Sequence, residues 1–355
     1  MESKLIKVIT AAAAGAAMAF AATGVWAADS PAELLKAAQR EGAVYSVGMP
    51  NTWANWVATW KDLQALGIKT QDTDMSSAEE VSKMLAEGEN ATADIGDVGF
   101  EFGAFAMKKG VTMPYKPSTW DQIPGWAKDK DGHWCLAYTG TVAFIVNKKL
   151  VKETPKSWAD LLKGKYRVSV GAVGSAAQAN YAVLAAAMAM GGSEKNLAPA
   201  YEFFAKIAQQ GRLSMVDPVV ANLEKGEVEV GMLWDFNALN YRDQIDRNLF
   251  DVVIPSEGSV MSGYTTIINK YSKHPNAAMF TREYILSDKG QINLANGYAR
   301  PIRAKYLDMP PEVKAKMLPE SQYKNARPVK DFQAWTNTSS HISRSWQSKV
   351  SIHMR

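Results

Sequence analysis

The chain has 355 residues, 40 Lys and Arg against 36 Asp and Glu, 47% hydrophobic residues and a single cysteine, Cys135. Its hydrophobic content excludes a largely disordered protein, and a net charge of only +4 argues against a nucleic-acid partner. A single cysteine excludes an intramolecular disulfide bond and a cysteine-rich metal site.

The N-terminus has the pattern of a secretory signal peptide over residues 1–28. A basic start at Lys4 and Lys7 precedes an apolar run over residues 8–25, and small residues follow from Ala27. This order is typical of a leader that is cleaved during export. An uncleaved anchor is the alternative, but the Ala- and Gly-rich run is weakly hydrophobic for a membrane span. We therefore predict a mature protein in the periplasm.

Strands and helices alternate in the first part of the mature chain. The pattern predicts helices at 31–40, 53–66, 78–87 and 102–109, and strands at 43–47, 68–70 and 93–98. Ser76 or Ser77 caps the third helix, with Glu79 and Glu80 in its first turn, where the helix dipole favours acids. This alternation indicates α/β layers around a mostly parallel sheet.

Two apolar segments, residues 138–146 and 262–268, are expected to cross between two lobes and to carry a hinge. A second α/β run lies between them, with strands at 166–170, 229–234 and 252–254 and helices at 178–190, 197–210 and 219–225. Further helices are expected at 276–286 and 311–317. The predicted fold is α/β, with two lobes joined by two crossings.

The sequence lacks the motifs of common hydrolases and nucleotide-binding proteins. Gly174-Ser175 has no flanking glycines of a nucleophile elbow, and Gly164-Lys165 is followed by Tyr166 instead of the Ser or Thr of a P-loop. The four histidines are scattered and form no metal-ligand or catalytic spacing. We therefore predict a protein that is not an enzyme and needs no metal or cofactor, with a secreted hydrolase as the alternative from another class.

Several stretches resemble the extracellular solute-binding proteins of ABC importers. Residues 154–161 are similar to the P-x-S-W-x-D-L that opens the second lobe in this family, and residues 253–258 to its P-x-E-G before the return strand. A third stretch runs from Asn269 through residues 284–291 to 297–301. The polyamine-, thiamine-, phosphorylated-compound- and ferric-iron-binding branches are the most similar.

This resemblance implies the two-lobed periplasmic binding protein fold of type II, with two crossover strands and a cleft between the lobes. It also implies a monomeric receptor that captures a small solute by hinge closure and delivers it to an ABC permease in the inner membrane; a receptor that serves a sensor is an open alternative. The expected division is lobe 1 over 29–140, lobe 2 over 141–262, and a return to lobe 1 over 263–355 with C-terminal helices packing across the lobes.

Loops that follow the strands are expected to line the cleft, because ligands of α/β lobes bind beyond the carboxyl ends of strands. These loops are 48–53, 97–101, 138–141, 171–178, 234–237 and 257–264. The candidate ligand-binding residues within them are Asn51, Thr52, Trp53, Gly99, Glu101, Tyr138, Thr139, Gly174, Ser175, Gln178, Trp234, Asp235, Asn237 and Tyr264. Trp56, Trp60 and Trp158 are interpreted as core residues.

The aromatic residues Trp53 and Trp234 favour a cationic or amine ligand, with Asp235 and Glu101 as countercharges. Asp235 has a second interpretation as a helix cap. The small residues at 171–178 open a helix and favour an anionic group instead. The predicted ligand is therefore an amine-bearing or zwitterionic solute, including one with phosphonate or phosphate, and the alternative is a purely anionic organic phosphate or carboxylate.

Two departures from the family's branches narrow this choice. Gly263 stands where the polyamine branch has an Asp, which argues against a plain polyamine. Asn240 and Arg242 flank Tyr241, where the ferric branch has adjacent tyrosines, and this argues against iron.

Overall fold

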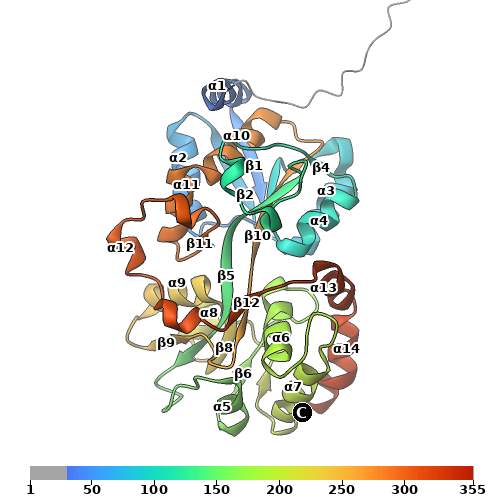
Figure 1. The fold of residues 1–355 in the computed structure, drawn as a ribbon, viewed down its shortest axis with the longest axis vertical. Coiled ribbons are helices and arrows are strands. Elements are labelled where there is room, and N and C mark those ends of the chain that lie inside the picture. Colours follow the sequence, from blue (N-terminus) through green and yellow to red (C-terminus); the bar gives the residue numbers. More distant parts are fainter. Residues whose placement is uncertain (1–29, 355) are drawn as a thin grey trace, which may run out of the picture.

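A computed structural model describes residues 30–354, so the predicted leader lies outside the described residues. Two α/β lobes are stacked along the long axis of the molecule and are joined by the long strands β5 (Trp134–Asn147) and β10 (Ser259–Asn269) (Figure 1). This arrangement confirms the predicted fold class. Among residues 30–354, no helix has the length and hydrophobicity needed to cross a membrane.

Lobe 1 begins with parallel strands covered by helices, as the alternating sequence pattern predicts. Strand β1 pairs in parallel with both β2 and β3. The first strands of lobe 1 are β1 (Ala43–Val47), β2 (Lys69–Thr73), β3 (Ile95–Gly99) and β4 (Thr112–Met113). Its first helices are α1 (Pro31–Glu41), α2 (Trp56–Ala65), α3 (Ser77–Glu87) and α4 (Phe100–Lys108). After β10 the chain returns to this lobe through α10 (Pro275–Leu286), α11 (Asp288–Asn296) and β11 (Arg300–Pro301).

Strands β5 and β10 are antiparallel neighbours, and each contributes to the sheets of both lobes. The first half of β5 pairs with β10, whereas its second half pairs with β8 (Val230–Trp234) and β9 (Phe250–Val253). The resulting strand order is β2-β1-β3-β10-β5-β8-β6-β7. The predicted crossings at 138–146 and 262–268 both fall within these strands, although each strand extends beyond the predicted segment.

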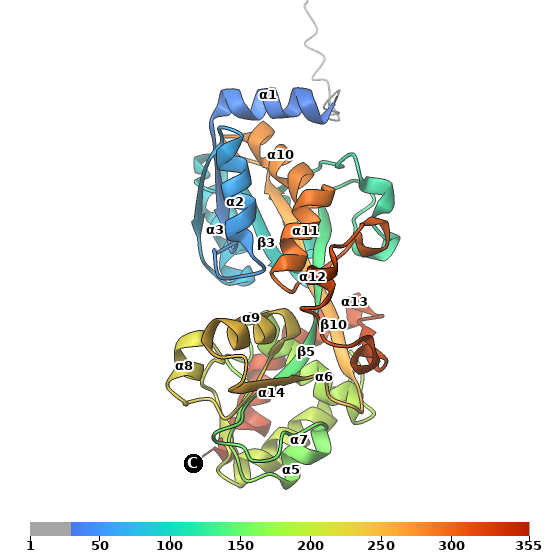
Figure 2. The same cartoon turned by 90° about the vertical axis from the view of Figure 1, so that its left-hand side faces the viewer.

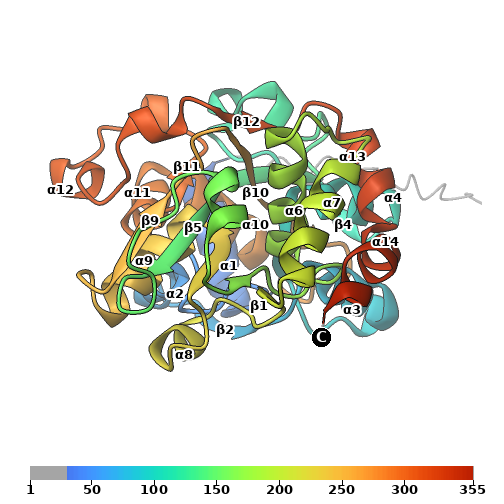
Figure 3. The ribbon, with the colours of Figure 1, turned by 90° about the horizontal axis from the view of Figure 1, so that it is seen from below.

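Lobe 2 surrounds the second half of β5. Its remaining elements are α5 (Trp158–Lys163), β6 (Val168–Ser169), α6 (Ala177–Ala189), α7 (Ala198–Gln209), β7 (Leu213–Ser214), α8 (Val220–Glu224) and α9 (Asp235–Ile245). Seen from below, α6 and α7 lie on one side of β5 and β10, and α9 lies on the other (Figure 3). The lobe-2 strand expected at 166–170 is shorter than predicted, because only Val168–Ser169 pairs with neighbouring strands.

The C-terminal part of the chain passes between the lobes a third time (Figure 2). After α12 (Pro311–Lys314), β12 (Ala326–Pro328) pairs with the Ser259 end of β10. The last helices then contact both lobes: α13 (Phe332–Ser339) packs against α4, and α14 (Ile342–Lys349) packs against α7. We therefore add a third connection between the lobes to the proposed division of the chain. It runs from β11 to α13.

The hydrophobic core contains tryptophans in both lobes. Trp56, Trp60 and Trp158 are at most 5% exposed, which confirms their interpretation as core residues. The chain also buries Trp335 on α13 and Trp346 on α14. Five of the eleven tryptophans in the sequence are thus core residues and not ligand contacts.

Two of the differences from the predictions concern the starts of helices. Helix α2 begins at Trp56 and not at Trp53, because Ala54 and Asn55 adopt positive φ angles of 45° and 60° that an α-helix does not allow. Helix α9 begins at Asp235, where the sequence indicates a loop over 234–237.

Candidate ligand-binding cleft

A cavity of about 560 Å³ lies between the lobes, beside the crossover strands. On the lobe-1 side it is lined by residues after β1, by the start of α3 and by the end of β3. On the lobe-2 side it is lined by the start of α6, the segment into α8, and α9. Tyr264 of β10 lines it as well. The carboxyl ends of parallel strands and the first turns of helices therefore meet here, as in other α/β proteins.

The cavity is lined by carboxylates and carries no opposing positive charge from the described chain. Asp74, Glu80 and Asp97 belong to lobe 1, and Asp217 belongs to lobe 2. Among the lining residues within 30–354 there is no Lys, Arg or His. This charge pattern favours a cationic group in the cavity.

Burial changes the acidity of three of these groups. Removal from water, together with the neighbouring carboxylates of Asp97 and Asp72, raises the pKa of Glu80 well above its usual value. Burial also raises the pKa of Asp97 well above normal and, to a smaller degree, that of Asp74. The ionised form of this cluster is therefore destabilised until a cation approaches it.

Two glycines make room for the Glu80 side chain. A Cβ atom on Gly48 would lie 2.2 Å from Oε1 of Glu80, and a Cβ atom on Gly96 would lie 2.6 Å from Oε2. Gly48 also has a φ of +68°, which side chains rarely adopt. The residue after β1 and the second residue of β3 thus leave room for a carboxyl group that a larger residue at either position would displace.

An aromatic hydrogen-bond relay orients Asp97. The indole Nε1 of Trp53 donates to the hydroxyl of Tyr138 at 2.7 Å, and this hydroxyl donates to Oδ2 of Asp97 at 2.6 Å. The Tyr264 ring lies 5.3 Å from the Trp53 ring and stacks on Tyr138 at 5.6 Å. This packing fixes one oxygen of Asp97 and builds an aromatic wall beside the carboxylates.

Four of the residues predicted from the sequence line this cavity: Thr52, Trp53, Gln178 and Tyr264. Tyr138 lies directly behind it, through its bonds to Trp53 and Asp97. Asn51 lines a neighbouring surface pocket instead. The loop after β1 thus contributes to the cavity through only part of its predicted residues.

The lobe-2 residues around Trp234 are buried behind the cavity. Trp234 is 1% exposed, and its Nε1 donates to the hydroxyl of Tyr264 at 3.1 Å. Gln178 accepts hydrogen bonds from the backbone of Trp234 and from Nδ2 of Asn237. These residues therefore support Gln178 and Tyr264, which line the cavity.

Asp235 holds the crossover region together. It is 1% exposed, and it accepts hydrogen bonds from the backbone N–H of Thr141 at 2.8 Å and from the hydroxyl of Tyr323 at 2.6 Å. Thr139 pairs with Arg300 in the same region, through β11. None of these residues is among those that line the cavity.

The remaining predicted residues lie where the two lobes touch or at the surface. Oε2 of Glu101 accepts a hydrogen bond from the hydroxyl of Tyr181 across the lobes at 2.9 Å, and a Cβ on Gly99 would lie 3.3 Å from that of Ala177. Gly174 and Ser175 are exposed, ahead of α6. A Cβ on Gly174 would collide with Ser343 of α14.

Sequence reasoning missed most of the acidic lining. Glu80 was explained by the helix dipole, and Asp97 was included only within the loop 97–101. The available signal was their position, because Asp74 follows β2 and Asp97 lies in β3, at the edge where the cleft was expected. Tyr241 was considered only as an iron ligand and Gln244 was not considered, because α9 was not predicted.

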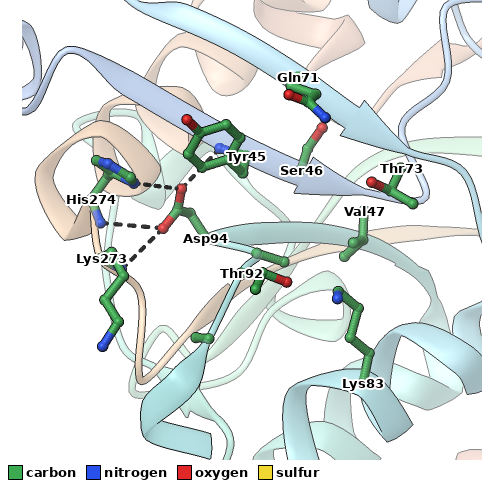
Figure 4. Close-up of a pocket in the computed structure, with 12 residues that line it drawn as sticks. Tyr45, Ser46, Val47, Gln71, Thr73, Lys83, Thr92, Asp94, Lys273 and His274 are labelled. Atoms are coloured by element: carbon green, nitrogen blue, oxygen red, sulfur yellow. Dashed lines mark hydrogen bonds and ion pairs between the residues drawn. The ribbon is translucent and has the colours of Figure 1, made fainter. Parts of the chain in front are cut away.

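A second cavity, of about 450 Å³, lies on the outer face of lobe 1 (Figure 4). Its main charged group, Asp94, accepts hydrogen bonds from the backbone of Tyr45 and Lys273 and pairs with the His274 ring at 3.0 Å. Lys83 is paired with Glu87. The polar groups of this cavity are paired with protein partners. The hydrogen bonds of Asp94 join the start of β3 to the segment before α10.

Two lobes joined by crossover strands, with a polar cavity between them, define a solute-binding protein. Residues 90–334 match the model of a family described as "Bacterial extracellular solute-binding protein". The chain belongs to this family and is the substrate-binding component of an ABC transporter. Its members act outside the cytoplasmic membrane and in transport, not catalysis.

Two curated relatives show similar sequences. A probable ABC transporter periplasmic-binding protein of Sinorhizobium fredii, y4fP, is 24% identical over 311 residues, which cover 84% of this chain and 83% of that protein. The sulfate-binding protein of Salmonella typhimurium is 25% identical over 221 residues, which cover 58% of this chain and 66% of that protein.

Solved structures share the fold at lower identity. The periplasmic binding protein AfuA of Actinobacillus pleuropneumoniae, with fructose-6-phosphate bound, has a TM-score of 0.69 and 18% identity, covering 87% of this chain and 98% of that chain. The Atu4243 GABA receptor has a TM-score of 0.66 and 19% identity, covering 87% and 97%. The ligands named for these relatives and structures differ in charge, so the fold alone does not define the solute.

Proposed function

We propose that this protein is a periplasmic receptor that captures a small amine-bearing or zwitterionic solute and delivers it to an ABC permease. Solutes that also carry a phosphonate or phosphate group belong to this class. The observation that carries the proposal is the charge of the cavity, where Asp74, Glu80, Asp97 and Asp217 line the walls without a described Lys, Arg or His.

Sulfate and fructose 6-phosphate, which are named for a relative and a similar structure, would meet this carboxylate cluster unfavourably. Like charges at a distance of about 4 Å repel by roughly 4 kcal/mol at an effective dielectric constant near 20. A cationic nitrogen on the solute reverses the sign of that interaction. The carboxylates therefore argue for an amine even though anions are bound elsewhere on this fold.

The start of α6 supports a second, anionic end on the same solute. Ala176, Ala177 and Gln178 bring the first turn of this 13-residue helix to the cavity wall. Backbone N–H groups in a first helical turn have no intrahelical acceptor and attract negative charge. A zwitterion would place its amine at the lobe-1 carboxylates and its anionic end towards α6.

Closure of the two lobes would retain the solute. Ligand contacts from both lobes stabilise the closed arrangement relative to the open one, which is how binding drives the hinge. The described structure already joins the lobes through Glu101–Tyr181 and through Nδ2 of Asn240, which donates to the carbonyl of Thr52 at 3.1 Å. The crossover strands β5 and β10 would carry the bending.

Isothermal titration of the mature chain with a defined panel tests this function. The amine-bearing compounds are 4-aminobutyrate, 2-aminoethylphosphonate, glycine and putrescine; the anions are sulfate, phosphate and fructose 6-phosphate. We expect binding of at least one amine-bearing compound, tightest for a zwitterion, and no binding of the anions. Native mass spectrometry of gently purified protein adds the mass of any retained solute.

If an anion that carries no amine group binds and no amine-bearing compound does, the anionic alternative replaces this proposal. Chemical change of a bound solute over hours would instead support the secreted hydrolase. Native mass spectrometry is also expected to show a monomer, and the cavity is lined by residues of a single chain.

A further inference from the structure

Two carboxylate oxygens at the lobe-1 wall are buried without a hydrogen-bond partner. They are Oε2 of Glu80 and Oδ1 of Asp97, and within residues 30–354 neither has a donor. Both side chains are 1% exposed and both line the cavity between the lobes. A buried polar group without a partner costs about 1–3 kcal/mol, and more when it is charged. Most buried polar groups in folded proteins are paired, so two unpaired oxygens on neighbouring residues that line a cavity call for an explanation.

Two other carboxylate oxygens in this cluster, one on Asp72 and one on Asp97, are already paired by the protein. Asp72 accepts hydrogen bonds from Oγ of Ser46 at 2.6 Å and from the backbone N–H of Met49 at 3.0 Å. The other carboxylate oxygen of Asp97 accepts the Tyr138 hydroxyl. These donors are used on Asp72 and on one oxygen of Asp97, whereas Oε2 of Glu80 and Oδ1 of Asp97, on two residues that line the cavity, accept no hydrogen bond within residues 30–354. Nε1 of Trp56, a neighbour of Asp97, is also without a partner there.

We propose that Glu80 and Asp97 together bind a cationic group that carries N–H bonds, namely a primary or secondary ammonium group of the solute. The inference rests on the proposed function and names the chemistry of one end of that solute. An ammonium group supplies both the positive charge and the donors that these two oxygens lack.

Two other cations fit these residues less well. A quaternary ammonium group has no N–H bond, so it would leave both oxygens without a donor and would rely on the faces of Trp53 and Tyr264. A metal ion needs several ligands in a defined geometry, and residues 30–354 contain no group of three or more His, Cys, Asp or Glu placed to hold one.

The decisive comparison uses pairs of compounds that differ only in N–H bonds. Each amine of the panel is titrated beside its N,N,N-trimethyl derivative, which keeps the positive charge; 4-aminobutyrate and 4-(trimethylammonio)butyrate form one such pair. We expect the trimethyl compound to bind about tenfold or more weakly, which corresponds to about 1.4 kcal/mol or more. The unmodified protein serves for this comparison, so it does not depend on the folding of a variant.

Substitutions then assign the effect to the two residues. Glu80→Gln and Asp97→Asn keep the side-chain shapes but remove the charge, and each is expected to weaken amine binding about tenfold or more. Glu202→Gln on the exposed face of α7 and Asp308→Asn after β11 are matched controls for charge and should bind normally. Thermal melts verify that every variant is folded.

Equal or tighter binding of the trimethyl compounds would overturn this inference and leave the amine receptor standing. Binding of CaCl2 or MgCl2 that is lost in Glu80→Gln would assign the pair to a metal ion and would also overturn it. Unchanged amine affinity in both folded variants would move the ammonium group elsewhere in the cavity. Silence from every amine in the panel would contradict the proposed function itself.

Discussion

The carboxyl group of Glu80 lies beside those of Asp97 and Asp72, so its ionisation opposes folding. Burial and these neighbours raise its pKa well above normal, and burial raises the pKa of Asp97 likewise. Between the ordinary and the raised pKa, the folded chain holds protons that the unfolded chain has released. Since stability falls with rising pH where the folded state binds more protons, this contribution is lost as the pH increases.

We therefore expect the ligand-free protein to melt at a higher temperature when the pH is lowered from about 8 to about 5.5. The Glu80→Gln variant should show a smaller rise, because its amide does not titrate. Scanning calorimetry of both proteins across this pH range measures the difference. An equal rise in melting temperature for the two proteins would show that Glu80 ionises without a folding cost.

Gly96 allows a change in the position of Glu80 without a change in its charge. In Gly96→Ala the new Cβ would lie 2.6 Å from Oε2 of Glu80 and 3.3 Å from the side chains of Met84 and Val47. We expect about 1–3 kcal/mol of destabilisation from overpacking, together with weaker amine binding. Urea unfolding and calorimetry measure both effects.

The matched variant is Gly125→Ala, since a Cβ there would meet nothing within 4 Å. It should leave stability and binding unchanged. Full amine affinity in Gly96→Ala would show that the position of the Glu80 carboxyl group is not critical.

At the scale of elements, helix α9 shows what a local pattern cannot predict. Its first residues, Asp235 and Phe236, follow strand β8 and look like a cleft loop, yet the helix is fixed by distant packing against β5 and β9. Strand β1, by contrast, was predicted over its observed length, Ala43–Val47. Gly42 and Gly48 flank this apolar run, so the limits of the strand can be predicted from neighbouring residues alone.

The candidate site divides in the same way. Trp53 and Tyr264 could be placed in the cleft because they lie directly after or within strands, and the edge of a sheet follows from strand order. The proposed role of Glu80 could not be predicted in this way, because the space for its side chain depends on Gly48 after β1 and Gly96 in β3, far from it in the sequence. An acid in a first helical turn has a sufficient local explanation, which hid its second role.

The buried Asp235 carboxyl group gives α9 a testable structural role. Asp235→Ala would leave the Thr141 N–H and the Tyr323 hydroxyl without their acceptor, at about 1–3 kcal/mol each. We expect a clear loss of stability and little change in amine affinity, because Asp235 does not line the cavity. Chemical denaturation and calorimetry separate the two quantities.

Asp235→Asn keeps an acceptor for Thr141 and should lose less stability than the alanine variant. A normal unfolding curve combined with lost binding would instead return Asp235 to the role of a direct ligand contact that the sequence indicates.

For the whole molecule, the proposed function requires the two lobes to move as bodies about β5 and β10. Contacts between them occur on both sides of these strands. Glu101 and Tyr181 meet near α4 and α6, whereas the hydroxyl of Tyr298 donates to Oδ2 of Asp243 at 2.6 Å near α9. These contacts hold the lobes together in the described structure, and under the proposed function the entry of a solute requires them to separate.

A disulfide bond between the lobes would hold them in this arrangement. Gly99 ends β3 in lobe 1 and Ala177 begins α6 in lobe 2, and their Cβ atoms would lie 3.3 Å apart, close to disulfide geometry. The native Cys135 is buried and does not compete. We expect the oxidised Gly99→Cys/Ala177→Cys protein to bind added amine at least about tenfold more slowly in stopped-flow fluorescence, because opening precedes entry.

Reductant should restore the rate, and neither single-cysteine variant should change the rate under oxidising or reducing conditions. Fast binding to the cross-linked protein would mean that solute reaches the cavity without separation of the lobes, and the hinge would then have to serve the permease alone.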